Sequence, residues 1–266
     1  MKAKGQKKSK KISISSGVII LLCGIAAFSF FQFVCGNPEN FDDKGHPING
    51  NVFGTLFQGG YVIPIVITLL LTVFALSVER FIALGKAKGK GNLVKFVDNA
   101  KTMLEDGDIN SARELCDKQQ GSVANILRAA LVRYEDIDKT NELSNDEKAG
   151  LVAKEIEDAT SLELPILEQN LSIIATISSL GTLFGLFGTV LGMIKSFGAM
   201  GQEGAPDSTA LAIGISEALM NTAMGIGTGA AAIIAYGFFS GKVTNVTNAV
   251  NEIGFAIGQT FTTRKK

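Results

Sequence analysis

The chain has 266 residues, and its 25 basic and 25 acidic side chains give a formal net charge of zero at pH 7. This balance excludes the overall basic field that is typical of nucleic-acid-binding proteins. The three cysteines are scattered and the single histidine stands apart from them, so neither a structural zinc site nor a disulfide framework is expected. We therefore predict no metal, no cofactor and no nucleic-acid partner.

Four segments without a charged residue run along the chain, at residues 17–35, 61–78, 171–194 and 218–240. Each is about long enough to cross a hydrocarbon core of roughly 30 Å as a helix that rises about 1.5 Å per residue. The cores of soluble proteins use shorter, amphipathic stretches instead. The sequence thus predicts an all-α integral membrane protein with about four transmembrane helices.

The first apolar segment follows six lysines within residues 1–11, a pattern that also describes a signal peptide. Residues 12–35 are longer than a usual signal core, and no small-x-small cleavage site follows them cleanly. Val34 before Cys35 is unlike a lipoprotein signal, which has a small residue there. We therefore expect this segment to be retained as an extra transmembrane helix.

Lysine and arginine are unevenly distributed among the polar connections, and in membrane proteins they gather on the cytoplasmic side. The N-terminal tail and the region after the second span are rich in lysine, whereas 36–60 has only Lys44 and 198–210 has no basic residue. Both termini and the central region are therefore predicted to be cytoplasmic. Lys195, near the outer end of the third span, is the exception, and its long side chain can extend to the interface.

The predicted organisation follows from these spans. It consists of a basic cytoplasmic tail (1–16), an extra transmembrane helix (17–35), a periplasmic loop (36–60), a transmembrane helix (61–84), a cytoplasmic helical domain (85–165), a transmembrane helix (166–197), a periplasmic loop (198–210), a transmembrane helix (211–240) and a cytoplasmic tail (241–266). In this arrangement Cys35 lies near the outer face and Cys116 in the cytoplasm. A membrane-impermeant thiol reagent should then label Cys35 in preference to Cys116.

The central region is predicted to be helical, with a break at Asp106-Gly107-Asp108 and short helices at 112–119 and 123–134. Ser144, followed three residues later by Glu147, spells a capping box, which should begin a long helix. We expect this helix to pass a kink at Pro165 and continue directly into the third span. The region has no phosphate-binding loop, nucleophile motif or paired-metal spacing, so we predict that the chain is not an enzyme.

The third and fourth spans are rich in small residues that recur every four positions. Such spacing forms a flat helix face on which a second helix can pack closely, and in lipid close packing replaces the hydrophobic driving force. Helix pairing alone would explain these glycines. The glycines that we assign to helix packing are Gly181, Gly185, Gly188, Gly192, Gly225 and Gly227.

Polar side chains stand among the glycines, and Glu217 is the most informative of them. A charged side chain at membrane depth costs at least roughly 2.5–3.5 kcal/mol, so such residues face a protein interior or water and are usually functional. A carboxyl group in such a place can gain and lose a proton. The alternative is an inert, solvated glutamate near the outer end of the helix.

Two stretches around these residues resemble a known family. Residues 185–197, Gly-Leu-Phe-Gly-Thr-Val-Leu-Gly-Met-Ile-Lys-Ser-Phe, resemble the G-L-L-G-T-V-x-G-x-x-x-S-F stretch of the ExbB/TolQ/MotA proton channel family. Residues 214–225, Gly-Ile-Ser-Glu-Ala-Leu-Met-Asn-Thr-Ala-Met-Gly, resemble its G-I-x-E-A-L-x-x-T-A-x-G stretch. Both stretches lie in order and in the expected spans, and a looser likeness extends from about residue 58 to residue 236.

The resemblance implies a proton-driven motor in the inner membrane of a Gram-negative bacterium. Its expected partners are an ExbD-like single-span protein, a TonB-like protein that carries force to the outer membrane, membrane lipid, and further copies of the chain. The expected assembly is a homopentamer whose pore is lined by the third and fourth spans. By position, Glu217 matches the membrane glutamate of the family, and Thr189 and Thr222 match threonines of the same proton pathway. The glutamate argues against a MotA-type protein, which lacks an acid there.

Three departures from the family pattern stand out. Proline is frequent in the family at the positions of Thr182 and Ala231, so helix bending there is an open point. The family usually has three spans, whereas this chain adds one at 17–35, and asparagine is common at the position of Lys195. An ExbB-like role in energising outer-membrane transport is the first interpretation; a TolQ-like role in outer-membrane integrity and a non-conducting membrane scaffold are the alternatives.

Overall fold

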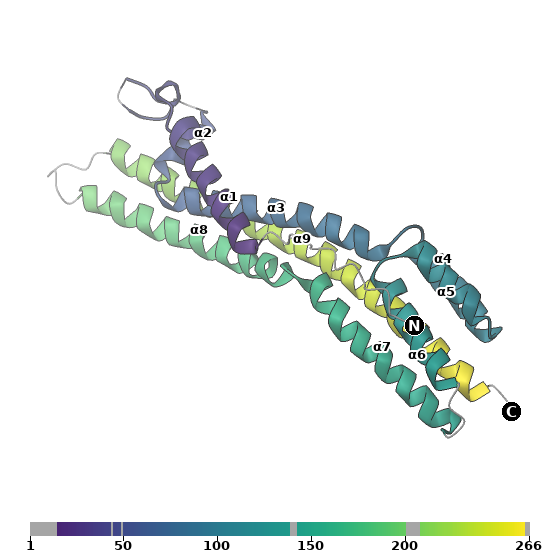
Figure 1. The fold of residues 1–266 in the computed structure, drawn as a ribbon. Helices are drawn as coiled ribbons and strands as arrows, with labels where there is room; N and C mark the ends of the chain where they lie inside the picture. The colour runs from purple at the N-terminus through teal and green to yellow at the C-terminus, as the bar shows by residue number, and fades with distance from the viewer. Residues whose placement is uncertain (1–14, 44, 49, 139–142, 201–207, 264–266) are drawn as a thin grey trace. The chain divides into compact units, whose positions relative to one another are not determined.

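The computed structural model describes residues 15–43, 45–48, 50–138, 143–200 and 208–263. The secondary structure of these residues is helical, apart from one isolated β-bridge between Phe41 and Pro47 (Figure 1). Four helical stretches among them are long and apolar enough to cross a membrane, within Ser16–Cys35, Val62–Glu105, Asn145–Gly198 and Leu211–Gln259. These helices confirm the predicted all-α membrane fold. Most of the tail predicted at 1–16, most of the loop predicted at 198–210 and the end of the tail predicted at 241–266 lie outside the described residues.

The chain divides into two compact units. The first lies within Met1–Leu76 and Thr176–Ala232, and the second within Ser77–Ala175 and Ile233–Lys266. Three helices contribute residues to both units: α3 (Val62–Lys88), α8 (Leu171–Met200) and α9 (Ser208–Thr263).

In the first unit, the extra N-terminal helix has a packed inner face and an exposed outer face. Helix α1 (Ser16–Phe30) continues as a π-helical segment, Phe31–Cys35, and the short helix α2 (Val52–Gln58) follows in the segment predicted as a loop. Phe31 stacks on Phe57 of α2 with ring centroids 4.9 Å apart. The core around this contact contains Ala27, Phe31, Cys35, Leu56, Ile63 and Ile67. The outer face exposes Leu21, Leu22, Ile25, Phe28 and Phe33.

The second unit contains the helical region predicted between the second and third spans. It is built from α4 (Leu93–Glu105), α5 (Ile109–Gln119), α6 (Ser122–Asp138) and α7 (Asn145–Glu168). Gly107 has a φ of +75° in the turn between α4 and α5, and Asp108 caps α5 by accepting a hydrogen bond from the Ser111 N–H. The predicted capping box of Ser144 and Glu147 is confirmed at the start of α7.

Both cysteines that we considered for thiol labelling, Cys35 and Cys116, are buried. Cys35 is fully buried and Cys116 is 3% exposed. Burial raises the pKa of the Cys116 thiol to about 12, so little thiolate forms there near neutral pH. Neither thiol is therefore a suitable reporter of membrane orientation, contrary to our expectation for Cys35.

The prediction of one continuous helix from the capping box into the third span is wrong. Helix α7 runs through Pro165 and ends at Glu168, and α8 begins at Leu171 after a break at Gln169 and Asn170. Asn170 has a φ of +65°, in the left-handed region that asparagine tolerates better than most residues. The chain thus changes direction at an asparagine, five residues beyond the proline that the sequence suggested.

A buried arginine satisfies the end of α7. Arg80 of α3 is 1% exposed, and its Nη1 donates hydrogen bonds to the carbonyl oxygens of Ile166 at 3.1 Å and Leu167 at 3.3 Å. The same guanidinium forms an ion pair with Glu79, which also accepts a hydrogen bond from the Asn170 side chain at 3.2 Å. The last carbonyls of a helix lack partners within the helix, and Arg80 supplies them from outside. No local pattern in the sequence predicts this contact.

We expect Arg80→Met to destabilise the protein by about 3 kcal/mol, because it leaves the α7 carbonyls and Glu79 without their buried partner. The thermal midpoint of the purified protein in detergent should fall by several degrees. Arg113→Met is the matched control, since the ion pair of Arg113 with Glu135 lies at the surface and should contribute at most about 1 kcal/mol. Equal losses in the two variants would contradict the buried role of Arg80.

Candidate functional site

The candidate site lies in the first unit, where α8 and α9 approach each other through glycines. A Cβ atom added at Gly185 would lie 2.8 Å from the Gly225 Cα, and one added at Gly225 would lie 2.6 Å from the Gly181 carbonyl oxygen. Real side chains essentially never come so close to backbone. Glycine at these positions therefore permits a backbone contact that any larger residue would prevent.

Two further glycines of α8 make room for side chains and backbone of α9. An added Cβ at Gly188 would lie 2.7 Å from the Asn221 Cβ, and one at Gly192 would lie 3.0 Å from the Ala218 Cβ. Gly227 differs from the other glycines of this set, because nothing in the described chain lies within 4 Å of an added Cβ there. Its face of α9 is open in the single subunit.

Glu217 is nearly buried and paired with a lysine. Its side chain is 8% exposed, whereas the side chain of Lys195 on α8 is 71% exposed. The Lys195 Nζ donates to both carboxylate oxygens of Glu217, at 3.2 Å to Oε1 and 3.1 Å to Oε2. A buried carboxylate needs such a partner because its charge is poorly solvated in low-dielectric surroundings. The one ion pair of Glu217 in the described part of the chain is thus with a side chain that also reaches the surface.

The two predicted threonines lie together, with Thr222 five residues after Glu217 on α9 and Thr189 facing it from α8. The hydroxyl groups of Thr189 and Thr222 are hydrogen bonded to each other. The Thr189 hydroxyl also lies 3.1 Å from the Gly185 carbonyl oxygen and 3.3 Å from that of Ala218, the residue after Glu217. The hydrogen bonds of the Glu217 carboxylate come from Lys195, and the two threonines form a separate hydroxyl pair beside it.

Asn221 is a further polar residue of α9, next to Thr222 and about one helical turn after Glu217. It is 3% exposed, and its Nδ2 donates a hydrogen bond to the Gly59 carbonyl oxygen at 3.1 Å. This bond ties α9 to the turn that precedes α3. The Asn221 Oδ1 and the Thr228 Oγ1 are buried without a hydrogen-bond partner in the described chain. The polar side chains of α9 therefore retain acceptor capacity inside an otherwise apolar unit.

We predicted one pathway for Glu217, Thr189 and Thr222, but not the contacts of Lys195 and Asn221. Lys195 was expected to extend toward the interface, whereas in the structure it binds Glu217 across the helix pair. The sequence feature that could have indicated this contact is the position of Lys195 at the end of an uncharged span. The bond from Asn221 to Gly59 joins residues that are 162 positions apart, and no local pattern predicts such a contact.

The helices are unbroken at the two positions where the family often has proline. Helix α8 continues through Thr182, whose hydroxyl donates to the Ser178 carbonyl oxygen at 3.3 Å. Helix α9 continues through Ala231 over its full 56 residues. Alanine and threonine keep the backbone N–H that proline lacks, so the helical hydrogen bonds are not interrupted there.

Comparison with known proteins relates the chain to one family. Residues 118–252, about half of the chain, match the MotA/TolQ/ExbB proton channel family. A putative biopolymer transport protein ExbB-like 3 of Synechocystis is 41% identical over 73 residues, which are 27% of this chain and 35% of that protein. The Tol-Pal system protein TolQ of Pseudomonas aeruginosa is 29% identical over 184 residues, 65% of this chain and 78% of that protein. The biopolymer transport protein ExbB of Helicobacter pylori is 38% identical over 89 residues, 34% of this chain and 59% of that protein.

The glycine contact can be tested by two matched substitutions. Gly185→Leu should separate α8 from α9, because the new side chain would collide with the Gly225 backbone, and it should lower the thermal midpoint markedly. Gly227→Leu adds the same side chain where the subunit has open space, so the fold should persist. Differential scanning fluorimetry of both purified variants checks this. Equal thermal midpoints would contradict the packing role of Gly185, whereas loss of oligomer in the Gly227 variant alone would place that face between subunits.

Proposed function

Because the chain belongs to the MotA/TolQ/ExbB proton channel family, we propose that it is an ExbB-like subunit of a proton-driven motor in the inner membrane. In this role it would energise TonB-dependent transport across the outer membrane. The observation that carries the proposal is the nearly buried Glu217, set between glycine-packed helices beside a hydroxyl pair. The family is one of channels rather than enzymes, and no nucleophile–base pair is needed for the proposed work.

The proposed mechanism rests on two protonation states of Glu217. A proton that crosses the membrane potential releases roughly 2.3 kcal/mol per 100 mV, which a motor must couple to a change of shape. The ionised carboxylate is stabilised by Lys195, whereas the neutral acid can face apolar surface at low cost. Alternation between these states would let a partner helix with its own carboxylate step past each subunit. Thr189 and Thr222 would provide hydroxyl groups along the same path.

The partners that we propose follow from the family and from the open faces of the helices. An ExbD-like single-span protein would occupy a pore formed by α8 and α9 of several copies, of which five is the expected number, and a TonB-like protein would transmit the force. Support comes from the open face at Gly227 and from exposed apolar side chains of α8 and α9, among them Leu186, Val190, Leu219 and Ile226. Such surfaces need either lipid or another helix as a neighbour.

A TolQ-like role is the second candidate, because the Pseudomonas TolQ relative aligns over a larger share of both chains than the ExbB relatives do. In that role the same machinery would maintain the integrity of the outer membrane. The membrane site does not distinguish the two roles. Identification of the single-span protein that co-purifies with the chain, by mass spectrometry, would decide between them.

We also propose that both termini and the helical region between the second and third spans are cytoplasmic, on the strength of the lysine distribution. Single cysteines at exposed Glu39 and Lys118, in a chain whose three cysteines are replaced by alanine, provide accessible reporters. An impermeant thiol reagent applied to spheroplasts should label Glu39→Cys and leave Lys118→Cys unmodified. The reverse pattern would overturn the orientation.

The decisive test of function is neutralisation of Glu217. Glu217→Gln keeps the shape of the side chain but cannot release a proton, so energised uptake should be abolished while expression and assembly persist. Glu217→Asp should retain partial activity, because its titratable group is displaced by about one methylene. Thr189→Val and Thr222→Val should impair uptake without necessarily abolishing it. Growth on a nutrient that requires active outer-membrane import, with co-purification of the partner as the control for assembly, measures each effect.

Lys195 provides a second arm of the same experiment. Lys195→Met removes the ammonium group that donates to both carboxylate oxygens of Glu217, so the buried carboxylate loses its ion-pair partner and energised uptake should fall. Lys195→Arg keeps the charge and should preserve uptake. Full growth of the Glu217→Gln variant would show that this carboxylate is structural, and a non-conducting scaffold would then replace the motor as the best explanation.

A further inference from the structure

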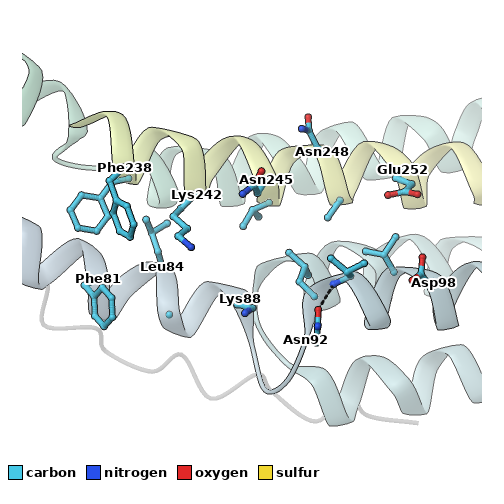
Figure 2. Close-up of a pocket in the computed structure, with 17 residues that line it drawn as sticks. Phe81, Leu84, Lys88, Asn92, Asp98, Phe238, Lys242, Asn245, Asn248 and Glu252 are labelled. Atoms are coloured by element: carbon cyan, nitrogen blue, oxygen red, sulfur yellow. Dashed lines mark hydrogen bonds between the residues drawn. The ribbon is translucent and has the colours of Figure 1, made fainter. Parts of the chain in front are cut away.

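A groove of about 570 Å³ lies within the second unit, between the end of α3, the start of α4 and the facing part of α9 (Figure 2). Its lining is largely apolar and includes Phe81, Leu84, Val94, Val97, Phe238 and Val246. Three of these side chains are exposed in spite of their size, Phe81 at 68%, Val94 at 67% and Phe238 at 52%. An apolar hollow flanked by exposed aromatic rings needs an apolar occupant.

The position of the groove along the helices indicates that membrane lipid can reach it. The uncharged run of α3 ends at Val78, three residues before Phe81, and Phe238 lies inside the uncharged run of α9. Helix rise places Phe81 only about 5 Å beyond the end of its run. The aromatic end of the groove is therefore level with the boundary between hydrocarbon and headgroups, where lipid contacts whatever the protein leaves uncovered.

The charged side chains of the groove are arranged by sign. Lys242 on α9 stands near the aromatic end, where its Nζ lies 5.3 Å from the centroid of the Phe238 ring, and Lys88 stands on the opposite wall toward the middle of the groove (Figure 2). Asp98 and Glu252 lie at the other end of the groove, where Glu252 is ion-paired with Lys101. The end of the groove next to the membrane is thus cationic, and the end away from it is acidic.

We propose that this groove binds an anionic phospholipid. The acyl chain packs against Phe81, Leu84 and Phe238, and the phosphate accepts hydrogen bonds from the ammonium groups of Lys88 and Lys242. Asp98 at the other end disfavours an anionic headgroup there and so favours one direction of the lipid. Juxtamembrane lysines commonly attract anionic lipids, and here a shaped apolar groove adds a specific place for the chain. This site is separate from Glu217 and does not depend on proton conduction.

Native mass spectrometry of the purified protein in detergent tests the proposal. Phosphatidylglycerol and phosphatidylcholine with identical acyl chains are titrated separately, and we expect phosphatidylglycerol to be retained more strongly. Replacement of Lys88 and Lys242 by glutamine should weaken phosphatidylglycerol binding about fivefold per lysine, with little effect on phosphatidylcholine. Lys118→Gln is the charge-matched control, because Lys118 is 77% exposed on α5, outside the groove.

A steric variant separates the groove from the charge effect. Gly85 lines the groove, and an added Cβ there meets nothing within 4 Å, so Gly85→Leu fills the space without a clash in the fold. It should abolish phosphatidylglycerol retention while thermal stability persists. Gly150→Leu on α7, which also meets open space, is the matched control and should bind lipid like the wild type.

Three results would overturn the proposal. Equal retention of the two lipids, or phosphatidylglycerol binding that ignores both the lysine and the Gly85 substitutions, would show that the groove is not a headgroup site. Dissociation of the oligomer by Gly85→Leu, with lipid retention unchanged, would instead identify the groove as a contact between copies of the chain.

Discussion

The close approach of α8 to α9 is the constraint on which the candidate site depends. Lipid tails are as apolar as the side chains that face them, so two membrane helices gain little from hydrophobic burial and must fit each other closely. Glycines at 181, 185 and 225 allow backbone contact between these helices. At that separation Asn221 fills the space beside Gly188, the hydroxyl groups of Thr189 and Thr222 meet, and Lys195 reaches Glu217. A wider spacing would break all three contacts together.

The ion pairs Arg80–Glu79 and Lys195–Glu217, near the ends of the spans, stabilise a poorly solvated charge in different ways. The buried partner of Arg80–Glu79 is the arginine, which also donates to two backbone carbonyls and is therefore fixed by several bonds. The buried partner of Lys195–Glu217 is the carboxylate, and its lysine is largely exposed on a flexible stem. The first pair fixes the break between α7 and α8, whereas the second joins a buried carboxylate to a lysine that solvent also reaches.

The extra N-terminal helix is packed rather than appended. Phe31 and Cys35 are buried against α2 and α3, and Met220 and Met224 of α9 border the same core. The outer side of α1 exposes leucine, isoleucine and phenylalanine, as expected for a helix that faces lipid. Its place beside the first turns of α3 makes it part of the unit that holds Glu217.

Much of this protein follows from the sequence by itself, since composition and local chemistry are enough for it. Uncharged runs determine the four membrane-length helices, the Ser144–Glu147 spelling determines where α7 begins, and the rarity of an acid in an apolar span singles out Glu217. Only the tertiary structure decided where α7 ends, because Asn170 and Arg80 act through contacts with residues about 90 positions away. It also decided that Lys195 binds Glu217 rather than extending to the interface, and that Gly227 faces open space while Gly225 touches backbone. Helix spacing and rotation set these pairings, and neither is encoded in a local pattern of residues.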